Sequence, residues 1–344
     1  MGKKEAGFTA LFISALRMRS EVLNLIGRNR EALASIKDAL FQASQIEDAL
    51  SLGECLIMES NIYGSLGDRS AMKNAAEKGL AAFAKAGDEN GKARCLNNLG
   101  YIAGASGDWK AAISLYSEAL RLKSYEGDLY GQAVTLNNMG KQYSLLQEKE
   151  KAMEHYQRSL DILKKINSLN GQAACLNNIG NLHSSSGRLE DALECFREAY
   201  GIRKISGDVQ GQSTALNNIG SIYQKKSMPS KAIIYLRKAC ILSRSIGDLL
   251  AEANAVNNIG AIHRADKKWR SALEHFKRAF DICRKIGEAY GAVFSGVNAG
   301  SALFAMGEGE KAEEYFTDAL EIARKTGNPR LEKDCLAVID KIKK

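Results

Sequence analysis

Pairs of asparagines recur along the chain every 40 residues, each within the pattern Leu/Val-Asn-Asn-(Leu/Met/Ile)-Gly. An amide side chain carries hydrogen-bond donors and acceptors together, so it can pair with a peptide backbone of any sequence. A ladder of such amides would hold an extended protein segment along its length. The alternative is structural, in that the amides satisfy exposed carbonyls and tie neighbouring repeats together. The pairs are Asn97 and Asn98, Asn137 and Asn138, Asn177 and Asn178, Asn217 and Asn218, and Asn257 and Asn258.

The other reactive side chains follow the same spacing. His183 and His263 stand in the column that holds Tyr143 and Tyr223 in other repeats, and His155 and His275 share a second column. An active site is expected to break such regularity where its chemistry is introduced. The sequence has no H-E-x-x-H motif, phosphate-binding loop or Cys/His metal cluster. We therefore predict no catalytic residues, no bound metal and no cofactor, so the chain is not expected to be an enzyme.

The asparagines are predicted to lie on the first helix of a helix pair. Gly-Asp or a close equivalent opens successive units, and a second glycine follows 20 residues later, for example at Gly87-Asp88 and Gly107. Glycine takes the left-handed conformation that ends a helix, and aspartate caps the next one. The same boundary recurs at Gly327-Asn328 near the end of the array. Each unit of 40 residues is thus two helices.

Small residues in fixed columns predict close packing between these helices. A glycine inside a helix costs about 1 kcal/mol relative to alanine, so a repeated glycine implies that the backbone is closely approached. The second helix carries alanine followed four residues later by a large side chain, as at Ala192 and Phe196. The predicted fold class is all-α, an α-solenoid. Its glycine column comprises Gly100, Gly140, Gly180, Gly220, Gly260 and Gly300.

Composition excludes several classes of protein. No segment approaches the roughly 18 apolar residues of a membrane span, and no secretory signal is present, so we expect a cytoplasmic protein without membrane contact. Seven cysteines, with no C-x-x-C pair, predict reduced thiols. The net charge is +8. Many of the cations lie in the last turns of helices, where they offset the helix dipole, which accounts for much of the excess.

The column order aliphatic-Gly-x-x-Tyr followed by Ala-x-x-x-Phe-x-x-Ala closely resembles the tetratricopeptide repeat. The 40-residue period is similar to the subgroup found in kinesin light chains and in the Leu-Gly-Asn (Pins-type) repeat proteins. The resemblance implies a single solenoid over residues 1–344, a right-handed superhelix of about eight units. The expected units lie near 9–46, 47–86, 87–126, 127–166, 167–206, 207–246, 247–286 and 287–326, followed by a capping helix at 330–342.

In this family the first helix of each unit lines a concave groove, and the resemblance implies that asparagines of each pair face it. Adjacent helical residues are about 100° apart, so which member of each pair points into the groove stays open. Other positions on the same helices are predicted to tune the ligand. Those with basic, amide or aromatic side chains are Arg94, Tyr101, Lys141, Asn181, Gln224, Lys225 and Arg264.

The predicted partner is an extended, partly acidic protein or peptide segment, because these groove positions include cations and no carboxylate. Phe294, Val297 and Phe304 make the last unit apolar, which predicts either an anchor pocket or contact with the capping helix. We expect an adaptor or scaffold. The alternative is a ligand- or peptide-sensing regulatory solenoid. Sparse aromatic residues argue against nucleic-acid binding, and the oligomeric state stays open.

Overall fold

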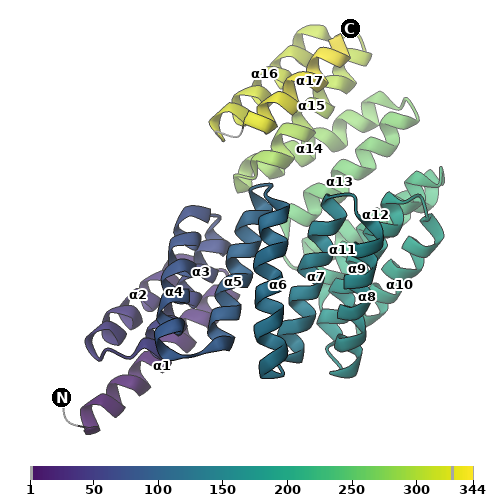
Figure 1. Cartoon of the computed structure of the whole chain (residues 1–344). Coiled ribbons are helices and arrows are strands. Elements are labelled where there is room, and N and C mark those ends of the chain that lie inside the picture. Colours follow the sequence, from purple (N-terminus) through teal and green to yellow (C-terminus); the bar gives the residue numbers. More distant parts are fainter. Residues whose placement is uncertain (1–2, 327–328, 344) are drawn as a thin grey trace. The chain divides into compact units, whose positions relative to one another are not determined.

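The structure, a computed structural model, describes residues 3–326 and 329–343, which form seventeen α-helices and no strand (Figure 1). The predicted all-α class is confirmed. The predicted helix break at Gly327 and Asn328 lies outside the described residues.

Two compact units divide the chain, Met1–Gly171 and Gln172–Lys344. The helices of the first unit are α1 (Lys3–Leu25), α2 (Asn29–Gln45), α3 (Ala49–Leu66), α4 (Arg69–Ala86), α5 (Glu89–Ala105), α6 (Trp109–Glu126), α7 (Leu129–Leu145) and α8 (Lys149–Lys165). The division falls in the first turn of α9 (Leu169–Ser185). The remaining helices are α10 (Leu189–Ile205), α11 (Val209–Lys225), α12 (Pro229–Ser245), α13 (Leu249–Ala265), α14 (Trp269–Ile286), α15 (Ala289–Ala305), α16 (Gly309–Lys325) and α17 (Pro329–Lys343).

Within each unit the helices stack as successive pairs. In the first unit every helix packs on the next, and α1, α3, α5 and α7 also contact one another in series. In the second unit α11, α13 and α15 form the same kind of series, with α12 and α14 packed between them. This arrangement is that of a tetratricopeptide solenoid, as the sequence predicts.

The turns between helices follow the predicted Gly-Asp chemistry. Gly87 ends α4 with a left-handed backbone (φ 71°), and the side chain of Asp88 accepts a hydrogen bond from the Gly91 amide at 3.0 Å at the start of α5. Several turns without glycine keep the left-handed conformation, including Gln147 (φ 64°) and Lys267 (φ 56°). These turns therefore keep the same backbone geometry even where another residue replaces glycine.

The glycine column of the first helices meets large side chains of the second helices. A Cβ at Gly180 would lie 2.7 Å from Cε1 of Phe196, and a Cβ at Gly260 would lie 2.7 Å from Cε1 of Phe276. Real Cβ atoms do not approach so closely, so the rings occupy the space that glycine leaves. The predicted close approach of the two helices is confirmed.

The last helix, α17, covers the apolar end of the second unit. Leu331, Cys335 and Ile339 are buried in one cluster with Val293 and Val297 of α15. Val297 thus contributes to the core beneath the capping helix, whereas Phe294 and Phe304 stay 44% and 42% exposed. Contact with the capping helix, one of the two predicted alternatives, is thus observed for Val297, and the predicted anchor pocket stays a prediction for the exposed phenylalanines.

Replacing Gly180 by Ala is expected to lower the stability of the second unit. The added methyl group pushes against Phe196, and overpacking of this kind costs about 1–3 kcal/mol, which outweighs the roughly 1 kcal/mol gained from helix propensity. The matched control is Gly201→Ala in α10, because a Cβ there meets no atom within 4 Å. Urea unfolding should show a lower midpoint for the first variant and a higher one for the second. Equal shifts of the two midpoints would contradict the close approach.

Candidate functional site

The asparagines of the second unit form a ladder of hydrogen bonds between consecutive first helices. Asn218 of α11 donates from Nδ2 to Oδ1 of Asn177 on α9 at 2.6 Å. Asn258 of α13 donates to Asn217 in the same way at 3.0 Å. Asn298 of α15 continues the series to Asn257 at 3.3 Å. The second asparagine of one pair is therefore the donor, and the first asparagine of the preceding pair is the acceptor.

The first unit contains a modified version of this ladder. Position 57 holds Ile where later repeats hold Asn. Asn98 donates instead to Asn61 Oδ1 at 2.8 Å and to Ser60 Oγ at 3.1 Å. The oxygen of Asn97 accepts from Thr135 Oγ1 of α7 at 3.1 Å. The remaining predicted asparagines, Asn137, Asn138 and Asn178, are half-buried like the others. Both units thus contain hydrogen bonds through which these amides tie neighbouring repeats together, as the structural interpretation of the pairs predicts.

These inter-repeat bonds use only part of the hydrogen-bonding capacity of the amide side chains. Each asparagine side chain has two N–H donors and an oxygen with two lone pairs. The bond from Asn258 to Asn217 uses one N–H of the first and one lone pair of the second. Because the bond fixes the orientation of both amides, the remaining donors are held in place at half-exposed positions. A ladder of this kind can bind both its neighbours and a ligand.

Arg94 forms an ion pair within the first unit and shares its carboxylate partner with a second arginine. Its guanidinium donates to the Glu54 carboxylate at 2.7 Å, and Arg17 pairs with the other oxygen of Glu54 at 3.1 Å. Glu54 occupies the same position of the repeat as Arg94, 40 residues earlier in the chain. The prediction of a groove without carboxylates considered the central units only, and it missed this residue. The repeat period itself was the signal that would have found it.

The other predicted ligand residues differ in what they contact. Arg264 donates to Asn298 Oδ1 at 2.7 Å and lies over the ring of Phe276, and burial lowers the pKa of its guanidinium. Lys225 donates to Ser184 Oγ at 2.6 Å. Tyr101, Lys141 and Asn181 are exposed, and Gln224 is half-buried. Arg264 is therefore part of the asparagine ladder. The exposed side chains lie on the first helices outside this ladder.

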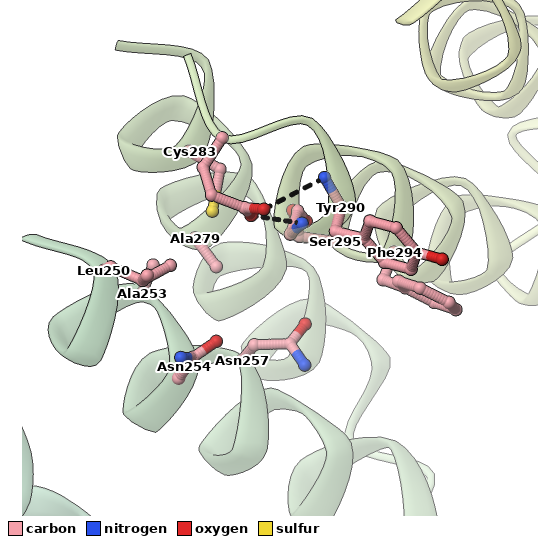
Figure 2. Close-up of a pocket in the computed structure, with 11 residues that line it drawn as sticks. Leu250, Ala253, Asn254, Asn257, Ala279, Cys283, Tyr290, Phe294 and Ser295 are labelled. Atoms are coloured by element: carbon pink, nitrogen blue, oxygen red, sulfur yellow. Dashed lines mark hydrogen bonds between the residues drawn. The ribbon is translucent and has the colours of Figure 1, made fainter. Parts of the chain in front are cut away.

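A cavity of about 440 Å³ lies between α13 and α15, with α14 forming its floor (Figure 2). Asn254 and Asn257 lie on one side, and Tyr290 and Phe294 on the other, where the two rings stack with centroids 5.9 Å apart. Ala279 and Cys283 line the cavity from α14. Burial raises the pKa of the Cys283 thiol to about 11, so the thiol is protonated at neutral pH and behaves as a small apolar group. The lining is mostly apolar, with amides along one edge and, at the start of α15, the Glu288 carboxylate, which accepts hydrogen bonds from the Tyr290 and Gly291 amides.

The same cavity occurs two repeats earlier, between α9 and α11, with a volume of about 210 Å³. Asn177 and Ala199 line it at positions equivalent to Asn257 and Ala279. Several of its positions differ in chemistry, since Ala174 stands in place of Asn254, Thr214 in place of Phe294, and Arg203, which pairs with Asp208, in place of Cys283. The repeat thus builds one type of pocket between consecutive first helices, and substitutions at a few columns change its lining.

The histidines occupy aromatic packing positions between the helices of a pair. The rings of His263 and His275 lie 5.2 Å apart, like the Tyr223–Tyr235 pair at 5.3 Å in the preceding repeat. Burial lowers the pKa of His263, and the nearby His275 adds to this effect, which favours a neutral ring. In the described part of the chain, no group of three or more His, Cys, Asp or Glu side chains is arranged to hold a metal ion. No described helix is long and apolar enough to cross a membrane.

A double-mutant cycle on Asn217 and Asn258 measures the strength of the ladder. The single changes Asn217→Ala and Asn258→Ala each break the same bond, so the double variant should lose less stability than the two single losses added, with a coupling of about 1 kcal/mol. The cycle cancels the gain in helix propensity from alanine. Asn254→Ala is the control, because this exposed neighbour makes no such bond, and it should be neutral or slightly stabilising. Strictly additive midpoints in urea unfolding would argue against an energetic role for the bond.

Comparisons with known proteins agree with this architecture. The tetratricopeptide repeat family profile matches five overlapping spans, 93–165, 131–205, 171–245, 211–285 and 251–325. No curated protein matched the sequence significantly.

Solved structures show the same fold at low sequence identity. A Rap protein complexed with competence and sporulation factor is 14% identical, with a TM-score of 0.63, and the match covers 96% of this chain and 97% of that one. Aspartyl phosphate phosphatase F from Bacillus subtilis is 16% identical, with a TM-score of 0.60 and coverage of 96% and 94%. BtubC from P. vanneervenii is 18% identical, with a TM-score of 0.52 and coverage of 64% and 91%. Since the family profile spans residues 93–325, more than half of the sequence, the chain belongs to the tetratricopeptide repeat family.

Proposed function

We propose that this protein is a non-catalytic scaffold that binds an extended, partly acidic segment of a partner protein along its first helices. The observation that carries the proposal is the recurrence of one pocket type two repeats apart, each pocket edged by the asparagine column. A periodic row of pockets suits an extended ligand that inserts side chains at intervals. The amides beside the pockets supply donors and acceptors for its main chain.

Charge supports a partly acidic ligand. Arg94 shares the Glu54 carboxylate with Arg17, and Arg264 donates to Asn298, so the exposed cations among the predicted groove residues are Lys141 in the first unit and Lys225 in the second. Both are exposed on first helices, in keeping with the net charge of +8. Charge-assisted hydrogen bonds from such lysines favour Asp or Glu side chains in the bound segment.

The fold and the thiols are consistent with this role. One structure with the same fold is a Rap protein complexed with competence and sporulation factor, so this helix arrangement accommodates a bound factor in at least one protein. All seven cysteines of this chain are free thiols, which suits a reducing compartment, and we place the protein in the cytoplasm.

A displayed library of random 12-residue peptides tests the proposal and does not require the partner to be identified. Panning against the full chain should enrich peptides that contain Asp or Glu and one large apolar residue. Lys225→Ala should weaken the enrichment of acidic residues. Recovery of no peptide above background, or of basic peptides, would overturn the proposal.

Asn254→Ala is expected to weaken binding of a selected peptide about 2- to 10-fold, as the loss of one hydrogen bond predicts. Asn254 borders the larger pocket and is exposed, so its replacement should leave the unfolding midpoint unchanged or slightly raised. The control is Asn74→Ala, an equally exposed asparagine on the second helix α4, which should bind normally. Fluorescence anisotropy with the labelled peptide measures both. Unchanged affinity in Asn254→Ala would remove this amide from the site.

Phe294→Thr converts the larger pocket toward the lining of the smaller one. The variant should lose the preference for a large apolar residue in the peptide library, because its aromatic wall is gone. It should keep the enrichment of Asp and Glu, since the lysines are untouched. Panning the variant and the unchanged chain side by side gives this comparison, and an unaltered apolar preference would contradict the assignment of this pocket.

A further inference from the structure

An apolar stripe runs along the exposed side of α1. Phe8 is 74% exposed, Leu11 73% and Val22 57%. Spacings of three, four and seven residues place these side chains on one face of the helix. The opposite face, which includes Ile13, is buried in a cluster with residues of α2 and α3. The stripe comprises Phe8, Leu11, Phe12, Met18, Val22 and Leu25 of α1, and Ile26 of the turn that follows it, all of them exposed.

The stripe belongs to the face that other first helices use for stacking. Val22 occupies the column of Ile62, which is fully buried in a cluster with Ile36 and other α2 residues. In the second unit the same column holds Ile222, which is 1% exposed and clusters with Phe196 of α10. In each case the covering helix belongs to the preceding pair. The exposed face of α1 is therefore a repeat-stacking surface without a described partner.

The C-terminal end of the array is finished differently. The cap, α17, turns Leu331 and Cys335 inward, and its other side carries the exposed charges Lys333 and Asp340 beside Leu336 and Val338, which are 37% and 40% exposed. Terminal repeats of solenoids usually carry a polar outer face. A head-to-tail contact between copies would bury Lys333 and Asp340 against an apolar stripe, which is costly. The surface that matches the stripe in chemistry is the stripe of another copy.

We propose that two copies of this chain associate through antiparallel packing of their α1 stripes. A two-fold axis level with Leu16 and Arg17 brings Phe8 opposite Leu25 of the second copy, and Leu11 opposite Val22. At the centre, the small Ala15 faces the long Met18. Each large side chain thus meets a smaller or aliphatic one, and each contact occurs twice, as an isologous interface requires. Parallel packing would instead place Phe8 on Phe8 and leave a gap between two copies of Ala15.

The area of the stripe is sufficient for a stable dimer. The seven exposed side chains each present on the order of 100 Å², or roughly 700 Å² in one chain. Pairing would remove roughly 1,400 Å² from water, within the ~1,200–2,000 Å² of specific protein interfaces. An unpaired apolar patch of this size is larger than most soluble monomers expose.

The mass in solution tests the association. Light scattering after size exclusion should give twice the chain mass of 37.5 kDa over about 1–100 µM. The double variant Leu11→Glu/Val22→Glu should be monomeric, with unchanged helical content by circular dichroism. Ile241→Glu is the matched control, because Ile241 is 65% exposed on α12 outside the stripe, and this variant should remain dimeric. A monomeric unchanged chain, or a dimer that survives the double change, would overturn the proposal.

Cross-linking tests the antiparallel register. Chains with Phe8→Cys and chains with Leu25→Cys, distinguished by mass, should cross-link to each other when mixed and not to themselves. Self-cross-linking of each variant would indicate parallel packing and contradict the register. Flotation with vesicles of neutral and anionic lipid checks the other occupant of an apolar helix face. Lipid binding by the unchanged chain that abolishes the dimer would refute self-association as the role of the stripe.

Discussion

The close contact between a glycine backbone and a large side chain holds each helix pair in a fixed geometry. At Gly180 and Gly260 the opposing ring carbons lie 2.7 Å from where a Cβ would be. No other residue type allows this separation without displacement of the ring or the helix. Because the contact recurs at Gly100, Gly140, Gly180, Gly220, Gly260 and Gly300, the first helices that carry it present the same columns in the same direction within each compact unit. The asparagine ladder and the recurring pockets both depend on this regularity.

This geometry has two consequences for the asparagine side chains. Successive first helices are close enough for Asn258 to reach Asn217 at 3.0 Å, so the amides link the repeats. The bond also fixes which atom of each amide is already used, and it leaves the other donors oriented at a half-exposed position. A structural role and a ligand-binding role therefore do not exclude each other. The linking bond would lower the entropy cost of ligand binding, because the side chains are already ordered.

Periodicity explains why much of the fold could be predicted from the sequence. The glycine breaks, the aspartate caps and the Ala-x-x-x-Phe columns are local signals that repeat, so each helix pair was predicted many times over. Departures from the pattern were harder to predict. Asn98 donates to Asn61 because Ile57, at the position of the usual asparagine, has no side-chain oxygen, and this bond depends on a neighbour outside the repeat pattern. Arg94 pairs with Glu54, which lies in its own column one repeat earlier, so the pair becomes predictable only when that column is followed beyond the central repeats.

The division between constant and variable columns suggests where specificity resides. Asn177 borders the smaller pocket and Asn257 the larger, and each accepts a bond from the following repeat, so a change at these positions would weaken the solenoid itself. Thr214 and Phe294 border the smaller and the larger pocket with no such constraint, and they differ in size and polarity. Under the proposed function, affinity for a main chain would come from the repeated amides, and discrimination between side chains from the variable wall. A repeat protein built in this way can change its partner through single substitutions at the wall and keep every contact that stacks one repeat on the next.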